Sequence, residues 1–218
     1  MFDTATARRM MVDGQVRTAD VTNLDLIAAM LAVPRELFVP ASLAGQAYSD
    51  ADIALGAGRA LLKPMVLAKL IQGAHVSRTD RVLDVGCGTG YSSAVLSHLV
   101  HSVVAVEEDA TFARSAQEAL SAGIRALNVT VNVGPLTAGW PAAAPYDVIL
   151  FNGATEVVPE VLGRQLKPEG RLACILGRAP TGKAMIYRII EGHLVGRPMF
   201  DAGASVLPGF VAPAAFVF

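Results

Sequence analysis

The hydrophobic pattern changes about a third of the way along the chain, which divides it into two stretches. In the first stretch, apolar residues recur at helical spacing. Three helices are expected there, over residues 4–18, 23–33 and 64–72. Residues 38–60 have no regular period and contain several Pro and Gly residues, which predicts a structured connection. We therefore expect a mainly helical N-terminal extension over residues 1–78.

Strands and helices alternate in the second stretch, residues 79–218. The expected strands are 81–85, 102–106, 129–133, 146–151 and 171–176, with helices over 91–99, 109–122 and 157–166 between them. Each strand is apolar almost throughout, which is typical of a sheet covered on both faces. We predict a doubly wound, mostly parallel α/β sheet that closes with an antiparallel hairpin over residues 184–195. The ends Phe210-Val211 and Phe216-Val217-Phe218 would add an edge or cover a face.

A glycine-rich loop follows the first strand of the second stretch. In an open α/β sheet, ligands bind where the carboxyl ends of strands meet the following helices, and glycines let the backbone approach a ligand closely. Glu107 ends the next strand, where a carboxylate can accept hydrogen bonds from both hydroxyls of a ribose. The expected cofactor-binding residues are Asp84, Gly86, Cys87, Gly88, Thr89, Gly90 and Glu107.

The spacing and charge of this loop favour S-adenosylmethionine over a dinucleotide. The dinucleotide fingerprint places its third glycine three residues after the second, whereas the pattern here is G-x-G-x-G. Asp84 would repel a pyrophosphate, but a carboxylate in its position can bind the ammonium group of S-adenosylmethionine. We therefore predict a Rossmann-like S-adenosylmethionine-dependent methyltransferase fold. The alternatives are a nicotinamide-dependent oxidoreductase and a glycine turn with a packing role only.

Composition limits the partners and the compartment. The chain has 18 basic and 19 acidic residues and a net charge of -1, which gives no electrostatic footprint for nucleic acid. It has no apolar run long enough for a membrane span and no signal-peptide pattern at its start, so we expect a cytoplasmic protein. Its two cysteines predict reduced thiols, and the spacing of its four histidines predicts no metal site.

Segments in both stretches resemble protein-L-isoaspartate O-methyltransferases. In the first stretch they are Gln15-Val16-Arg17, the run from Val33 to Pro40, and Ala47-Tyr48-Ser49-Asp50. In the second they are the glycine loop with Tyr91, Val106-Glu107, the run from Tyr146 to Ile149, and the run from Gln165 to Leu172. The resemblance implies methyl transfer from S-adenosylmethionine to the free α-carboxylate of an isoaspartyl residue in a damaged protein. It also places the N-terminal extension on the substrate side, with Tyr48 near the substrate entrance.

The chain departs from the family pattern on the substrate side. The family has a Thr-Ile-Ser stretch before a proline, but Ala60 and Leu62 stand at the two hydroxyl positions here, so no catalytic side chain is assigned. Arg59 and Lys63 flank this stretch, and they either pair with an anionic substrate group or are solvated surface charges. The substrate-side candidates are therefore Arg59, Leu62, Lys63 and Tyr48.

A second departure concerns the cofactor. Pro135 stands where the family has the aspartate of a Gly-Asp-Gly near the adenine, so either cofactor affinity is reduced or another residue takes over. The two departures leave an alternative function open. The chain would then be a divergent S-adenosylmethionine-binding protein without isoaspartate repair, acting as a binding or regulatory module or on another methyl acceptor.

Overall fold

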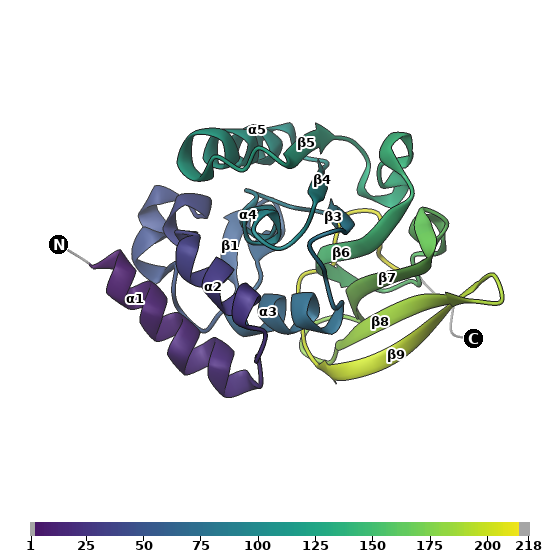
Figure 1. Cartoon of the computed structure of the whole chain (residues 1–218), viewed down its shortest axis with the longest axis horizontal. Coiled ribbons are helices and arrows are strands. Elements are labelled where there is room, and N and C mark those ends of the chain that lie inside the picture. Colours follow the sequence, from purple (N-terminus) through teal and green to yellow (C-terminus); the bar gives the residue numbers. More distant parts are fainter. Residues whose placement is uncertain (1–2, 214–218) are drawn as a thin grey trace.

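A seven-stranded sheet forms the centre of the structure, a computed structural model that describes residues 3–213 (Figure 1). The strand order is β5-β4-β3-β6-β7-β8-β9. The strands are β3 (Arg81–Val85), β4 (Ser102–Glu107), β5 (Val129–Val133), β6 (Tyr146–Thr155), β7 (Leu166–Leu176), β8 (Lys183–Ile190) and β9 (His193–Asp201). The first five in this order are parallel, and β8 and β9 pair antiparallel. The predicted mostly parallel sheet with a closing hairpin is confirmed.

The helices follow the expected order, with one difference in length. They are α1 (Thr4–Met11), α2 (Leu24–Ala32), α3 (Pro64–Gly73), α4 (Tyr91–Ser97), α5 (Ala110–Glu118) and α6 (Glu160–Gly163). Short π and 3-10 turns continue α1 to residue 19 and α5 to residue 124. The helix expected over 157–166 is only one turn long, so that prediction was wrong. The Gln165 carbonyl accepts the backbone N–H of Tyr146 at 2.8 Å, which draws the chain into pairing with β6.

A small hairpin lies where the sequence predicted an irregular connection. It pairs β1 (Ile53–Gly56) with β2 (Arg59–Leu61) in an antiparallel sheet of its own. The two residues between the strands, Ala57 and Gly58, have φ values of 48° and 71°. Positive φ at both positions is the geometry of a tight two-residue hairpin turn. Strands this short carry too little alternation for the pattern to show them.

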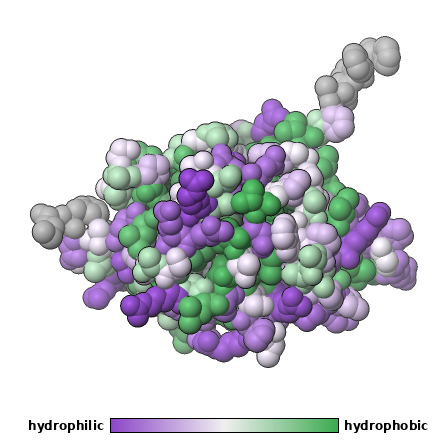
Figure 2. Space-filling view, turned by 90° about the horizontal axis from the view of Figure 1, so that it is seen from above, coloured by the Kyte–Doolittle hydropathy of each residue, from purple (hydrophilic) through white to green (hydrophobic). Residues whose placement is uncertain are grey.

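The N-terminal helices share a hydrophobic core with the sheet. Met11, Leu26 and Met30 belong to the same buried cluster as Val82 and Leu96. Figure 1 shows α1, α2 and α3 gathered beside α4 on one side of the molecule, and the surface in Figure 2 intersperses polar and apolar residues. No helix within residues 3–213 is long and apolar enough to cross a membrane.

The C-terminal aromatic residues are only partly described. Phe210 is buried and packs edge-on against Phe151 of β6, with ring centroids 5.1 Å apart. It therefore covers one face of the sheet, as one of the two expectations had it. Residues 216–218 lie outside the described part of the chain.

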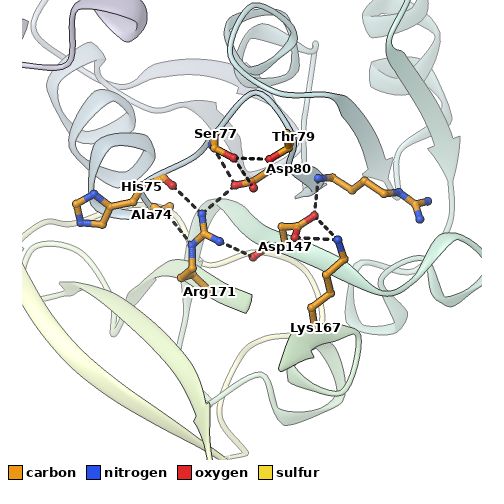
Figure 3. Close-up of polar contacts among 9 residues, drawn as sticks. Ala74, His75, Ser77, Thr79, Asp80, Asp147, Lys167 and Arg171 are labelled. Carbon is orange, nitrogen blue, oxygen red and sulfur yellow. Dashed lines mark hydrogen bonds and ion pairs between the residues drawn. The ribbon is translucent and has the colours of Figure 1, made fainter. Parts of the chain in front are cut away.

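A polar network fastens the amino ends of the central strands (Figure 3). The Arg171 guanidinium donates to the Asp80 carboxylate at 2.8 Å and to the two carbonyls that follow α3, at 2.9 and 2.7 Å. Lys167 pairs with Asp147 at 2.8 Å, and Asp147 also accepts the backbone N–H of Arg81. The network lies at the edge of the sheet opposite the glycine loop, so it supports the fold and leaves the carboxyl ends of the strands to a ligand.

Candidate functional site

The glycine loop connects β3 to α4 at the carboxyl edge of the sheet, where the sequence predicted it. Gly86, Gly88 and Gly90 have φ values of 70°, 56° and 96°, a region that other residues rarely adopt. At Gly90 a Cβ would also lie 3.0 Å from the Cβ of Ala116 in α5. These positions therefore need glycine for their conformation, and Gly90 also needs it for the close packing of α5.

Asp84, in β3, stabilises this loop through hydrogen bonds with α4 and β6. Its side chain is fully buried, with one oxygen accepting from the hydroxyls of Ser92 (2.7 Å) and Ser93 (2.5 Å) and the other from the amide of Asn152. Burial raises the pKa of Asp84 to about 6, although these hydrogen bonds oppose the shift. The predicted contact of Asp84 with an ammonium group stays a prediction.

Glu107 ends β4 and points across the loop. One carboxylate oxygen accepts the backbone N–H of Gly88 at 2.7 Å. The other accepts the backbone N–H groups of Glu108 (2.9 Å) and Asp109 (3.2 Å). The Glu107 side chain is fully buried, yet it borders a cavity of about 310 Å³. Its position at the second strand of the pair matches the one expected for a ribose-binding carboxylate.

Arg59 reaches the same place from β2. Its Nη1 donates to Glu107 at 2.6 Å and its Nη2 to the Gly86 carbonyl at 2.7 Å. Only 5% of the Arg59 side chain is exposed, so the alternative in which Arg59 is a solvated surface charge is wrong. Pairing of Arg59 with an anionic substrate group stays a prediction. The sequence indicated no link between Arg59 and Glu107, which lie far apart along the chain.

The other positions before Pro64 mainly support the backbone. Leu62 is buried, and its carbonyl accepts from the Arg35 guanidinium at 2.7 Å. Lys63 is half-buried at the start of α3, and its backbone N–H donates to the Asp52 carboxylate at 2.8 Å. Ala60 pairs with Ala54 in the small hairpin. Their predicted contacts with substrate remain predictions.

Tyr48 joins the N-terminal helices to the chain that follows them. Its hydroxyl accepts from Arg8 Nε at 3.0 Å and donates to the Glu36 carboxylate. Burial raises the pKa of Tyr48 to about 12, so the phenol stays protonated at neutral pH. A place at the substrate entrance remains a prediction for this residue.

Sequence reasoning missed the role of Arg35. This arginine is fully buried, donates to the carbonyls of Ala47 and Leu62 at 2.7 Å each, and stacks over the Tyr91 ring at 4.6 Å. It therefore holds the segment before α3 against the N-terminal extension. Arg35 lies in the run from Val33 to Pro40 that resembles the family, but nothing in the sequence pattern indicates that its charge is buried.

The remaining loop residues have structural partners. Burial raises the pKa of the Cys87 thiol well above its usual value, which leaves it a poor nucleophile. The Thr89 hydroxyl donates to the Phe38 carbonyl at 2.5 Å and so ties the loop to the N-terminal extension. Within residues 3–213, no group of three or more His, Cys, Asp or Glu side chains could hold a metal ion.

Pro135 is exposed just beyond β5, next to the cofactor edge. The preceding Gly134 donates its N–H to the Glu107 carbonyl at 3.1 Å, which keeps this turn beside β4. Pro135 has neither a carboxylate nor a backbone N–H to offer an adenine. The turn is therefore in place, but its polar contribution at this position is lost.

The acceptors at this edge fit S-adenosylmethionine. Glu107 can accept from the ribose hydroxyls, the Gly86 carbonyl can accept from a cationic amine, and the loop glycines present no Cβ to a ligand. The adjoining cavity of about 310 Å³ lies at the lower end of the size usual for ligand pockets. Arg59 donates to both of these acceptors.

Comparisons with known proteins identify the family of this chain. Residues 7–193 match the family model of protein-L-isoaspartate(D-aspartate) O-methyltransferase. A protein-L-isoaspartate O-methyltransferase of Methylorubrum extorquens is 39% identical over 200 residues, covering 92% of this chain and 85% of the relative. One of Pelotomaculum thermopropionicum is 40% identical over 181 residues, covering 83% and 79%.

Two solved structures share the fold. A protein-L-isoaspartate O-methyltransferase superposes with a TM-score of 0.79 at 25% identity, covering 93% of this chain and 66% of that one. This chain thus spans about two thirds of the length of that structure. A Plasmodium falciparum protein assigned to the same enzymes, solved with S-adenosyl-L-homocysteine, gives a TM-score of 0.79 at 16% identity, covering 92% and 97%. At that identity the second likeness shows the fold alone.

Proposed function

The chain belongs to the protein-L-isoaspartate O-methyltransferase family, and on this premise we propose that it methylates the free α-carboxylate of isoaspartyl residues in damaged proteins, with S-adenosylmethionine as donor. One observation carries the proposal: the family match covers the N-terminal extension as well as the glycine loop and Glu107. A protein that had kept only the cofactor domain would match over that domain alone. The match therefore favours the repair reaction over the alternative of a divergent binding module.

The cofactor half of the reaction is assigned to the loop and the end of β4. When bound, S-adenosylmethionine supplies an electrophilic methyl group on a sulfonium. Glu107 holds the ribose hydroxyls, and Gly86, Gly88 and Gly90 allow the backbone to lie against the ligand. Asp84 keeps the loop in place through its contacts with α4 and β6.

The acceptor half needs orientation more than it needs a base. A carboxylate is already ionised at neutral pH, so it attacks a methyl group without losing a proton first. The missing hydroxyls at Ala60 and Leu62 therefore remove possible hydrogen bonds to the acceptor, but not the nucleophile. Buried apolar side chains such as Leu62 and Leu207 help to exclude water, which favours methyl transfer to the aligned oxygen.

The organisation of the chain follows from these roles. We propose that residues 1–78 form the substrate side and residues 79–218 the cofactor domain, with Lys63 and Tyr48 near the acceptor. The substrate is an isoaspartyl-containing protein or peptide. A cytoplasmic location suits the two buried free thiols, Cys87 and Cys174, because reducing compartments keep thiols unpaired.

Two measurements on the purified chain test the proposal. Calorimetric titration with S-adenosyl-L-homocysteine measures cofactor binding, and methyl transfer to an isoaspartyl peptide is compared with its aspartyl counterpart. We expect binding, and transfer to the isoaspartyl peptide only. Binding without transfer would favour the alternative function, and the double variant Ala60→Thr/Leu62→Ser would then show whether the hydroxyls are the deficit. Absence of both would refute the cofactor assignment as well.

A further inference from the structure

The guanidinium of Arg59 lies directly over the glycine loop. A Cβ placed on Gly86 would be 2.9 Å from Arg59 Nη2 and 3.0 Å from a methyl group of Leu207, so these two side chains occupy the space beside the first loop glycine. The ion pair with Glu107 is almost completely buried, at 5% and 0% exposure. Buried pairs of this kind are shielded little by solvent, so the contact persists at ordinary ionic strength.

Arg59 donates hydrogen bonds to the same two acceptors that the cofactor would use. Glu107 and the Gly86 carbonyl are both acceptors, and a guanidinium has donors only. S-adenosylmethionine would bring its ribose hydroxyls to the first acceptor and its ammonium group to the second. Its ammonium and sulfonium charges would also be repelled by the Arg59 cation, strongly so in a buried site. This charge repulsion, together with the shared space over Gly86, opposes binding of the side chain and the cofactor to these acceptors at the same time.

We propose that Arg59 is an internal competitor of the cofactor. Arg59 occupies the Glu107 carboxylate and the Gly86 carbonyl, and S-adenosylmethionine binds only as Arg59 leaves. This inference rests on the proposed function, because it assigns a regulatory step to the same site. It also makes Arg59 a residue that sets cofactor affinity, with no direct part in methyl transfer.

The adjoining cavity offers Arg59 a second partner. Glu108 lines it together with Arg59 and Glu107, and the Glu108 side chain is exposed. Within residues 3–213 the carboxylate of Glu108 has no hydrogen-bond or ion-pair partner, whereas Asp109 uses one of its oxygens to cap α5. Arg59 thus exchanges a buried carboxylate for an exposed one nearby, which keeps its charge paired when the cofactor enters.

Titration with S-adenosyl-L-homocysteine tests this competition. Arg59→Gln removes the charge and shortens the side chain. We therefore expect the Kd of this variant for S-adenosyl-L-homocysteine to fall about tenfold, which corresponds to about 1.4 kcal/mol of binding free energy. Arg59→Lys keeps the charge but cannot hold both acceptors with one ammonium group, so an intermediate Kd is expected. Arg78→Gln, at an exposed arginine paired with Asp25, is the matched control and should bind as the wild type does.

A double-mutant cycle tests the second partner. Glu108→Gln removes the carboxylate that receives Arg59, so it should weaken binding several-fold in the wild-type background. The same change should have no effect on binding in the Arg59→Gln background, because no guanidinium is then present to pair with Glu108. An equal loss in both backgrounds would overturn the role of Glu108.

The outcomes separate this inference from the proposed function. If folded Arg59→Gln binds no more tightly than the wild type while the wild type methylates isoaspartyl peptide, the competition is refuted and the function stands. Binding by Arg59→Gln but not by the wild type supports the competition. If neither binds, both are overturned. Circular dichroism and thermal unfolding report whether each variant folds, and if Arg59→Gln does not, a wild-type Kd for Arg59→Lys overturns the proposal.

Discussion

Replacing Asp84 by asparagine should change how stability depends on pH. Burial raises the pKa of Asp84 from about 3.8 to about 6, so the folded protein keeps a proton that the unfolded chain releases between these values. The stability that this proton brings is present below about pH 4 and is lost as pH rises through about 6. A shift of about two pKa units corresponds to about 3 kcal/mol.

Asp84→Asn keeps the shape of the side chain and cannot titrate. The Ser92 and Ser93 hydroxyls can rotate to suit an amide, so the hydrogen bonds in the cluster can be retained. Urea unfolding of wild type and variant from about pH 4 to about pH 7 gives the difference in free energy of unfolding at each pH. This difference should move by about 3 kcal/mol in favour of the variant as pH rises.

Comparing the two proteins cancels the carboxylates that titrate in both. Asp147, whose pKa is lowered by its contacts with Arg81 and Lys167 against the effect of burial, is one of these. Asp50→Asn, at an exposed position, controls for the loss of one carboxylate. Parallel curves for wild type and Asp84→Asn would refute the buried-acid reasoning.

Three further predictions concern stability, each measured by urea unfolding. Arg35→Lys should cost about 2 kcal/mol, because a single ammonium group cannot serve both backbone carbonyls that the buried guanidinium holds; an unchanged midpoint would contradict this. Gly90→Ala should cost about 1–2 kcal/mol from its positive φ alone, while Gly45→Ala, with open space around it, is the control. Arg171→Met should cost about 3–5 kcal/mol by leaving buried Asp80 unpaired, with S-adenosyl-L-homocysteine affinity unchanged.

The sequence predicted the parts of the structure that repeat a simple pattern. The strands around the glycine loop are apolar on both faces, so β3 and β4 were found with nearly correct ends. The hairpin of β1 and β2 was missed because it has too few residues to show alternation. The helix expected from residue 157 proved to be α6 alone, because pairing with β6 outweighed helix propensity.

The candidate site was predictable only in its cofactor half. The glycine spacing and Glu107 can be recognised from the sequence, because neighbouring residues determine both the conformation of the loop and the position of the carboxylate. Arg59 could not be placed this way, because its partner comes from another part of the fold. Similarly, the contact of Asn152 with Asp84 depends on β6 lying beside β3, which only the sheet order reveals.

The shared core of the N-terminal helices and the sheet has a consequence for synthesis on the ribosome. Helix α2 packs against α4, and the Gln72 side chain at the end of α3 accepts the backbone N–H groups of Thr22 and Asn23. These partners emerge several seconds after α2 when translation adds roughly 5–20 residues per second. During this interval the apolar faces of the first helices are exposed to solvent. We therefore expect chaperones that bind nascent chains to bind this protein before its central strands are synthesised.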